Sequence, residues 1–155
     1  MNIKIHRMSL ELKINEALKN AMREKNKTAL ESIRAIKSAL LMLKTDGKTE
    51  TISEEQEMAL LQRLVKQRKE AAEQFFANDR QELGENEIAQ AKIIEQFLPE
   101  QMSIEEIEAA LKNIISEVGA VDVKDLGKIM PIATKQFAGK ADGKTVSETV
   151  RKLLS

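Results

Sequence analysis

The sequence predicts an all-α protein, in which an N-terminal domain of about four helices precedes a C-terminal three-helix domain. Hydrophobic residues make up 42% of the chain and aromatic residues only 3%, so the core must be aliphatic. Leu, Ile, Ala and Met favour helices over strands. Apolar residues also recur every three to four positions along the chain, which is the helical period, and no segment alternates as a strand would.

Two helix patterns occupy the first third of the chain. The first begins at Ser9 and ends before the polar residues 23–27. Thr28 is expected to cap the second, which should end before a turn at 45–48 that contains Asp and Gly. Residues 1–7 precede the first helix signal and are predicted to be a flexible leader.

The third and fourth helices follow this turn. Ser53 and Gln56 have the spacing of a capping box, in which the hydroxyl and the side-chain amide each satisfy a free backbone N–H. They predict the start of a long third helix. Asp79 is expected to cap the fourth. Gly84 lies inside the fourth pattern at a cost of about 1 kcal/mol relative to alanine, or else marks a helix end.

Pro99 marks the clearest boundary in the chain. Proline disfavours the α-helical conformation in the residue before it, so the fourth helix should end at Leu98. We therefore predict an N-terminal helical domain over residues 8–98 and a C-terminal three-helix domain over residues 99–155.

The C-terminal domain has its own start and stop signals. Ser103 begins a second capping box, and Gly119 is expected to end the helix that follows. Asp122 should cap the next helix. Pro131 should kink or end that helix, because proline lacks the N–H that an internal position donates. A turn at 139–144 leads to the last helix.

Composition excludes several classes of function. The chain has no cysteine, which rules out disulfides and thiolate chemistry and suits a reducing compartment, so we expect a cytoplasmic protein. Its only histidine, His6, lies in the predicted leader, so no Ser–His pair is expected. No nucleotide-binding glycine motif occurs. We expect no catalytic residues, no metal and no cofactor, and no apolar run approaches the roughly 20 residues of a membrane helix.

The charges are unevenly distributed although the net charge is zero. Residues 1–45 hold ten Lys or Arg and four Asp or Glu, whereas residues 82–120 hold two and nine. This asymmetry indicates either basic and acidic interaction surfaces or ordinary solvated helix faces.

Two stretches are candidate contacts with phosphate. The first is a basic stripe on the third helix and just beyond it: Arg63, Lys66, Arg68, Lys69 and Arg80. The alternative is a solvated face bonded to neighbouring acidic helices. The second is the turn Gly139-Lys140-Ala141-Asp142-Gly143-Lys144. Its glycines permit a tight backbone, and its lysines flank a helix start that favours anions. The alternative is an ordinary turn in which Asp142 caps the last helix.

Six segments, in this order and spacing, resemble the YqeY family: 29–39 (ALESIRAIKSA), 67–75 (QRKEAAEQF), 79–80 (DR), 97–101 (FLPEQ), 126–130 (LGKIM) and 139–144 (GKADGK). The resemblance covers residues 8 to 155. It implies an N-terminal helical domain and a C-terminal three-helix domain similar to the tail of the B subunit of glutamine-dependent aminoacyl-tRNA amidotransferase.

The resemblance also implies a function. That tail holds the body of the tRNA, and by position its functional turn corresponds to Gly139, Lys140, Asp142, Gly143 and Lys144. The expected function is therefore a non-catalytic tRNA-binding module, and the alternative is an adaptor for a protein of the tRNA-charging machinery. The family label, carbon–nitrogen ligase with glutamine as amido-N-donor, would be inherited from the tail without independent activity. Neither DNA nor a membrane is expected as a partner.

Overall fold

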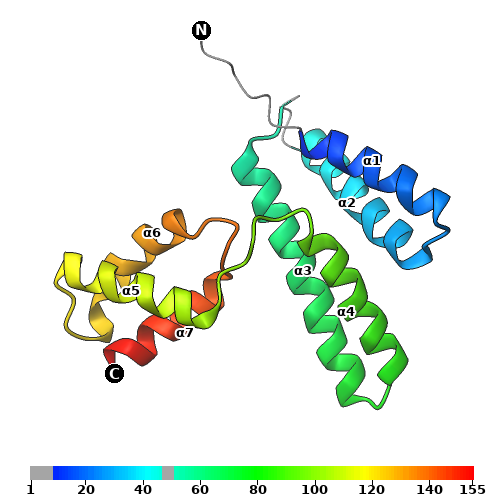
Figure 1. Ribbon diagram of the computed structural model, residues 1–155. Coiled ribbons are helices and arrows are strands. Elements are labelled where there is room, and N and C mark those ends of the chain that lie inside the picture. Colours follow the sequence, from blue (N-terminus) through cyan, green and yellow to red (C-terminus); the bar gives the residue numbers. More distant parts are fainter. Residues whose placement is uncertain (1–8, 47–50) are drawn as a thin grey trace, which may run out of the picture. The chain divides into compact units, whose positions relative to one another are not determined.

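The computed structural model describes residues 9–46 and 51–155, so the predicted leader lies outside the described part. The described residues form seven α-helices and one short 3-10 helix, which confirms the all-α class (Figure 1). The chain divides between Phe97 and Leu98 into two compact units.

The N-terminal unit contains four helices: α1 (Leu10–Arg23), α2 (Lys27–Asp46), α3 (Glu54–Ala77) and α4 (Gln81–Glu95). With 24 residues, α3 is the longest and spans about 36 Å. The helices pair as two hairpins, α1 with α2 and α3 with α4, and α2 also packs against α4 (Figure 1).

The core of this unit is aliphatic, as the composition requires. Ile14, Ile36, Leu61 and Ile94 are almost completely buried and come from four different helices. Each helix therefore has its apolar face covered by a neighbour, and this burial supplies most of the stability of such helices. Ser32 is fully buried among them, and its hydroxyl donates to the Thr28 carbonyl oxygen at 2.8 Å.

The helix starts in this unit confirm some predictions and correct others. Ser53 and Gln56 form the predicted capping box. Thr28 does not cap α2, because the helix begins one residue earlier and the Asn26 side chain accepts from the Ala29 N–H at 3.1 Å. Asp79 does not cap α4 either. It has a left-handed backbone (φ 57°) in the turn, and α4 begins after Arg80 without a side-chain cap.

Gly84 is buried within α4, so it does not mark a helix end. A Cβ atom at this position would lie 2.3 Å from Cε1 of Phe76 on α3. The Phe76 ring therefore occupies the space that a side chain would fill. This close packing between the two helices explains a glycine at a position where alanine has the higher helix propensity.

The C-terminal unit contains α5 (Ile104–Val118), the 3-10 helix η1 (Val123–Asp125), α6 (Leu126–Gln136) and α7 (Gly143–Leu154). The three α-helices pack against one another around a single core. Its buried residues are Ile107, Leu111, Ile114, Ile129, Ala133, Phe137, Val146 and Val150. Ser103 caps α5 through the Glu106 N–H, but the reciprocal bond of the predicted capping box is absent, and the Glu106 carboxylate accepts from the Ser103 hydroxyl instead. Gly119 ends the helix in the left-handed conformation (φ 73°), as predicted.

Asp122 and Asp125 together order the start of α6. Asp122 accepts from the Lys124 N–H at 2.9 Å and so caps η1, whereas α6 itself begins after Asp125 without a side-chain cap. The Asp125 carboxylate accepts from the backbone N–H groups of Val121, at 2.9 Å, and Asp122, at 3.4 Å. These bonds, with Val121 the larger contributor, and the nearby Lys128 ammonium lower the pKa of Asp125.

Pro131 does not end α6, so the helix end that was one of the two predicted outcomes is absent. The helix runs from Leu126 to Gln136 as one element with the proline inside it. Proline removes the N–H that would bond to the Gly127 carbonyl. Both residues are exposed, so water can reach that carbonyl, while Ile129 and Ala133 keep the opposite face of α6 in the core.

The contact between Gly84 and Phe76 predicts a coupling between substitutions at these positions. In a Phe76→Ala background, Gly84→Ala should raise the free energy of unfolding by up to about 1 kcal/mol, because alanine is the better helix former. With Phe76 present this gain should vanish or reverse, because the added methyl group displaces the ring. Urea denaturation of the four proteins measures the coupling, and equal effects in both backgrounds would contradict the contact.

The lowered pKa of Asp125 predicts that the C-terminal unit loses stability at acidic pH. Its folded pKa lies below the ordinary value of about 3.9, so its stabilising contribution is present above that value and is lost as the pH falls through the folded pKa. Asp125→Asn should remove this dependence. Unfolding free energies measured from neutral pH to about pH 2 should fall more steeply for the wild type than for the variant. Parallel curves would show that Asp125 does not titrate with folding.

Candidate nucleic-acid interface

The predicted turn at 139–144 joins α6 to α7 and is held by backbone hydrogen bonds. The N–H groups of Lys140 and Ala141 both donate to the Phe137 carbonyl, at 2.8 and 3.2 Å. Gly139 is buried with φ 75°, a left-handed conformation in which a Cβ would be strained. The chain thus reverses around Gly139 directly after the buried Phe137 ring.

The segment before α5 fixes this turn from the other side. The Gln101 side-chain amide donates to the Gly139 carbonyl at 2.8 Å and to the Pro99 carbonyl at 2.9 Å. The Met102 N–H donates to the Lys140 carbonyl at 2.9 Å. Two motifs that the sequence presents separately, residues 97–101 and 139–144, are therefore joined by hydrogen bonds within the C-terminal unit.

Asp142 begins α7. Its side chain accepts from the Lys144 N–H at 3.4 Å, and its carbonyl accepts from the Val146 N–H at 3.0 Å. Gly143 is the first residue of the helix and is exposed, with open space where a Cβ would lie. The capping role that the sequence offered as an alternative is thus present at this turn. It directs the start of α7 toward solvent.

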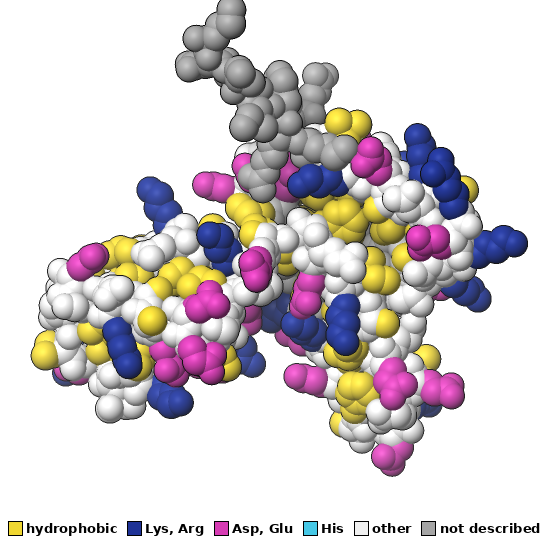
Figure 2. Space-filling model, viewed as in Figure 1, with side chains coloured by type: hydrophobic (Ala, Val, Ile, Leu, Met, Phe, Trp, Pro, Cys, Tyr) yellow, Lys and Arg dark blue, Asp and Glu magenta, His cyan; other side chains and the backbone are white. Residues whose placement is uncertain are grey.

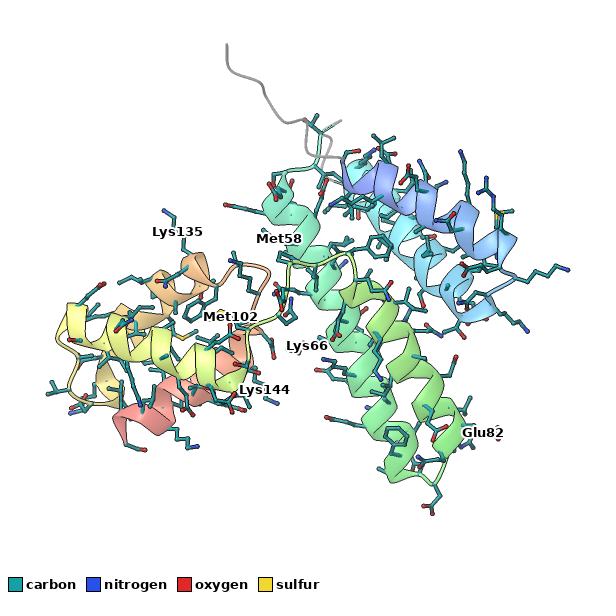
Figure 3. All side chains as sticks on the ribbon, in the orientation of Figure 1. Met58, Lys66, Glu82, Met102, Lys135 and Lys144 are labelled. Atoms are coloured by element: carbon teal, nitrogen blue, oxygen red, sulfur yellow. The ribbon has the colours of Figure 1, made fainter. Side chains whose placement is uncertain are left out.

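Lys140 and Lys144 are the charged side chains of this turn that remain available. Both are exposed, and neither has an ion pair within residues 9–46 and 51–155. Figure 3 labels Lys144 at the start of α7 and Met102 before α5. Each lysine adds to the positive end of the helix dipole, which the Asp142 carboxylate partly offsets.

The basic stripe of the N-terminal unit has a different environment. Lys69 Nζ lies 2.8 Å from Glu95 Oε1, and Arg68 Nε lies 3.8 Å from Glu87 Oε2. Both acceptors belong to α4, so these two cations bind the neighbouring acidic helix. Arg68 Nε and Glu87 Oε2 are buried without a hydrogen-bond partner, since 3.8 Å is too long for one.

The remaining three cations of the stripe are exposed. Arg63 and Lys66 lie on α3, where Figure 3 labels Lys66, and Arg80 directly precedes α4. None of them has an ion pair in the part of the chain that the structure describes. The stripe and the turn belong to different units, so each is a separate candidate surface.

Gln101 is the residue at this turn that the sequence reasoning did not single out. It occurs in the motif of residues 97–101, but nothing in its local sequence indicates a bond to Gly139, 38 residues away. Glutamine in a loop is usually solvated. Only the tertiary structure identifies it as the side chain that orders the turn.

Two further features, a metal cluster and a membrane-spanning helix, are absent from the described residues. Across the two described ranges, no three His, Cys, Asp or Glu side chains gather closely enough to hold a metal ion. None of the helices described is both long enough and apolar enough to cross a membrane.

Comparison with known proteins places the chain in a family. A family model described as "Yqey-like protein" matches residues 11–154. "Altered inheritance of mitochondria protein 41, mitochondrial" from Kluyveromyces lactis is 31% identical over 137 residues, which cover 86% of this chain and 69% of that protein. The protein of the same name from Pyrenophora tritici-repentis is 29% identical over 142 residues, covering 88% and 76%. The chain therefore belongs to the YqeY family.

Proposed function

We propose that this protein is a non-catalytic tRNA-binding module and that the turn at residues 139–144 is its contact with the tRNA backbone. The observation that carries the proposal is a turn fixed from both sides by hydrogen bonds, with two exposed and unpaired lysines at the start of α7. The resemblance to an amidotransferase tail that holds tRNA supports the same site. The module has no amidotransferase activity of its own in this proposal.

The chemistry of this turn suits phosphate and does not suit base recognition. Two exposed lysine ammonium groups at the positive end of a helix dipole are suited to phosphate oxygens. The one aromatic side chain of the C-terminal unit, Phe137, is 2% exposed and cannot stack on a base. Binding would therefore depend on the spacing of phosphates in a folded RNA, and its affinity should fall with salt.

An adaptor function is the second candidate, and a surface on the α3–α4 hairpin favours it. Phe76 and Leu83 are 37% and 44% exposed, and they lie close to the turn that joins the two helices. Acidic residues accompany them, including Asp79 and Glu82. An apolar and acidic surface of this kind suits a basic protein segment, such as one from the tRNA-charging machinery.

The cytoplasm is the location that we propose for this function. The absence of cysteine fits a reducing compartment, and tRNA is abundant there. The related fungal proteins carry the word mitochondrial in their names.

The tRNA proposal predicts salt-dependent binding that prefers folded RNA. Purified protein should bind labelled total tRNA more tightly than an unstructured RNA of equal length. Lys140→Glu/Lys144→Glu should weaken binding and lower the slope of log affinity against log salt by about 2, or about 1 for each lost phosphate contact. Titration at three salt concentrations measures both effects.

A matched control separates local from general electrostatics. Lys112→Glu/Lys124→Glu makes the same change in net charge at two exposed positions on α5 and η1. It should bind tRNA with a slope close to that of the wild type. Equal losses in both variants, or no binding of the wild type at the lowest salt, would reject the turn as an RNA contact. A partner protein recovered from lysate after nuclease treatment would then favour the adaptor.

Loss of the Gln101 side chain should weaken tRNA binding indirectly, by loosening the turn at 139–144. Gln101→Ala removes both side-chain hydrogen bonds, and should lower the free energy of unfolding by about 1 kcal/mol. Amide hydrogen exchange at Met102 should become faster, because its bond to Lys140 depends on the position of the turn. Binding of tRNA should weaken while its salt slope stays the same, because no phosphate contact is removed. An unchanged Met102 exchange rate would show that Gln101 does not order the turn.

A further inference from the structure

A further basic surface lies where α1 meets α2. It consists of four cations, Lys19, Arg23, Lys25 and Lys27, which we call the basic elbow. All four are exposed. None has an ion pair with any residue that the structure describes, whereas Lys44, Arg68 and Lys69 of the same unit lie against carboxylates.

The geometry of the helices brings these cations to one end of the hairpin. Lys19 and Arg23 are four residues apart on α1 and share one face of that helix. Lys25 lies in the connection, and Lys27 is the first residue of α2. Figure 2 shows Lys and Arg side chains gathered over the α1–α2 hairpin, on the right of the view. One carboxylate, Glu24, interrupts the cluster.

Two of the four cations stand where the local structure would favour another residue. Lys25 follows Glu24, the C-cap of α1, with a left-handed backbone (φ 54°), and the next N–H, of Asn26, donates to the Ala21 carbonyl at 2.9 Å. Glycine is the usual residue at such a helix end. Lys27 lies at the positive end of the α2 dipole, and the first turn of α2 has no acidic residue to offset it.

Helix stability therefore does not explain why lysine occupies positions 25 and 27. Lys25 is placed against the backbone preference of its position, and Lys27 is placed against the dipole of α2. An anionic partner that binds both would explain these two placements. A membrane-binding surface would set a broad apolar face beside its cations. Within residues 19–27, Met22 is the one large apolar side chain, and it is 57% exposed. A polyanion without an apolar phase fits this surface better.

We infer that the basic elbow is a second RNA-binding surface, which contacts the phosphate backbone independently of the C-terminal turn. The inference rests on the proposed function in one respect, namely that the partner is RNA. Four exposed cations on adjoining helix ends can contact several successive phosphates. They would add a sequence-independent contribution to affinity and raise its salt dependence.

The two misplaced lysines provide a test in which stability and binding move in opposite directions. Lys25→Gly and Lys27→Glu should each unfold at a urea concentration no lower than the wild type. Glycine suits the left-handed backbone at position 25, and glutamate suits the positive end of the α2 dipole at position 27. Each variant of the full chain should nevertheless bind tRNA several-fold more weakly. The slope of log affinity against log salt should fall by about 1 in each case.

Control variants match these changes in charge. Lys112→Gln and Lys112→Glu alter an exposed lysine of α5 by the same amounts as Lys25→Gly and Lys27→Glu, and should retain the slope of the wild type. Vesicles containing anionic phospholipid provide the second ligand. Elbow variants that lose vesicle binding and retain tRNA binding would overturn the inference in favour of a lipid contact.

The outcomes separate this inference from the proposed C-terminal site. Elbow variants with wild-type affinity and slope, alongside a weakened Lys140→Glu/Lys144→Glu variant, would overturn the elbow alone. Weakened elbow variants beside an unaffected turn variant would support the elbow and reject the turn. A wild-type chain that does not bind tRNA at the lowest salt would overturn both.

Discussion

Aliphatic helix faces have to bury one another in this chain, because cysteine is absent and aromatic residues are few. An isolated amphipathic helix of ten to twenty residues is marginal in water, so each helix depends on its neighbours. In the N-terminal unit the α1–α2 and α3–α4 hairpins meet through α2 and α4, and in the C-terminal unit three helices share one core. The position of Gly84 beneath the Phe76 ring follows from the same requirement for close helix packing.

The basic side chains on the surface of these helices fall into two groups, those paired with carboxylates and those without a partner among the described residues. Where α3 faces α4, cations lie against carboxylates, as Lys69 does with Glu95. At the turn of residues 139–144 and at the basic elbow, lysines are exposed and have no carboxylate partner among the described residues. Paired cations are partly neutralised, whereas unpaired cations at helix ends contribute an open positive field. The unpaired groups are therefore the stronger candidates for binding an anionic partner.

The C-terminal turn depends on parts of the unit that are distant in sequence. Gly139 permits the left-handed backbone, and Gln101 and Met102 hold its carbonyl groups from the segment before α5. Asp142 then directs the start of α7. A turn held in this way presents its lysines from an ordered backbone, which lowers the entropy lost on binding.

The sequence by itself determined the helical class, the family and most of the helix starts. Periodicity and caps such as Ser53 and Ser103 act within about four residues, so they can be predicted without a fold. Local reasoning failed where a neighbouring residue took over the role, as Asn26 did for Thr28. The predicted helix end at Pro131 is also absent, because the exposed side of α6 accommodates the proline.

Only the tertiary structure decided which candidate residues remain free. The sequence presents Arg68, Lys69, Lys140 and Lys144 as equivalent cations, and the fold pairs the first two with α4. The bond of Gln101 to Gly139 joins positions 38 residues apart, and the cost of Gly84 is explained only by Phe76 on another helix. Such contacts depend on how whole helices pack, and that information is not contained in any local pattern of the chain.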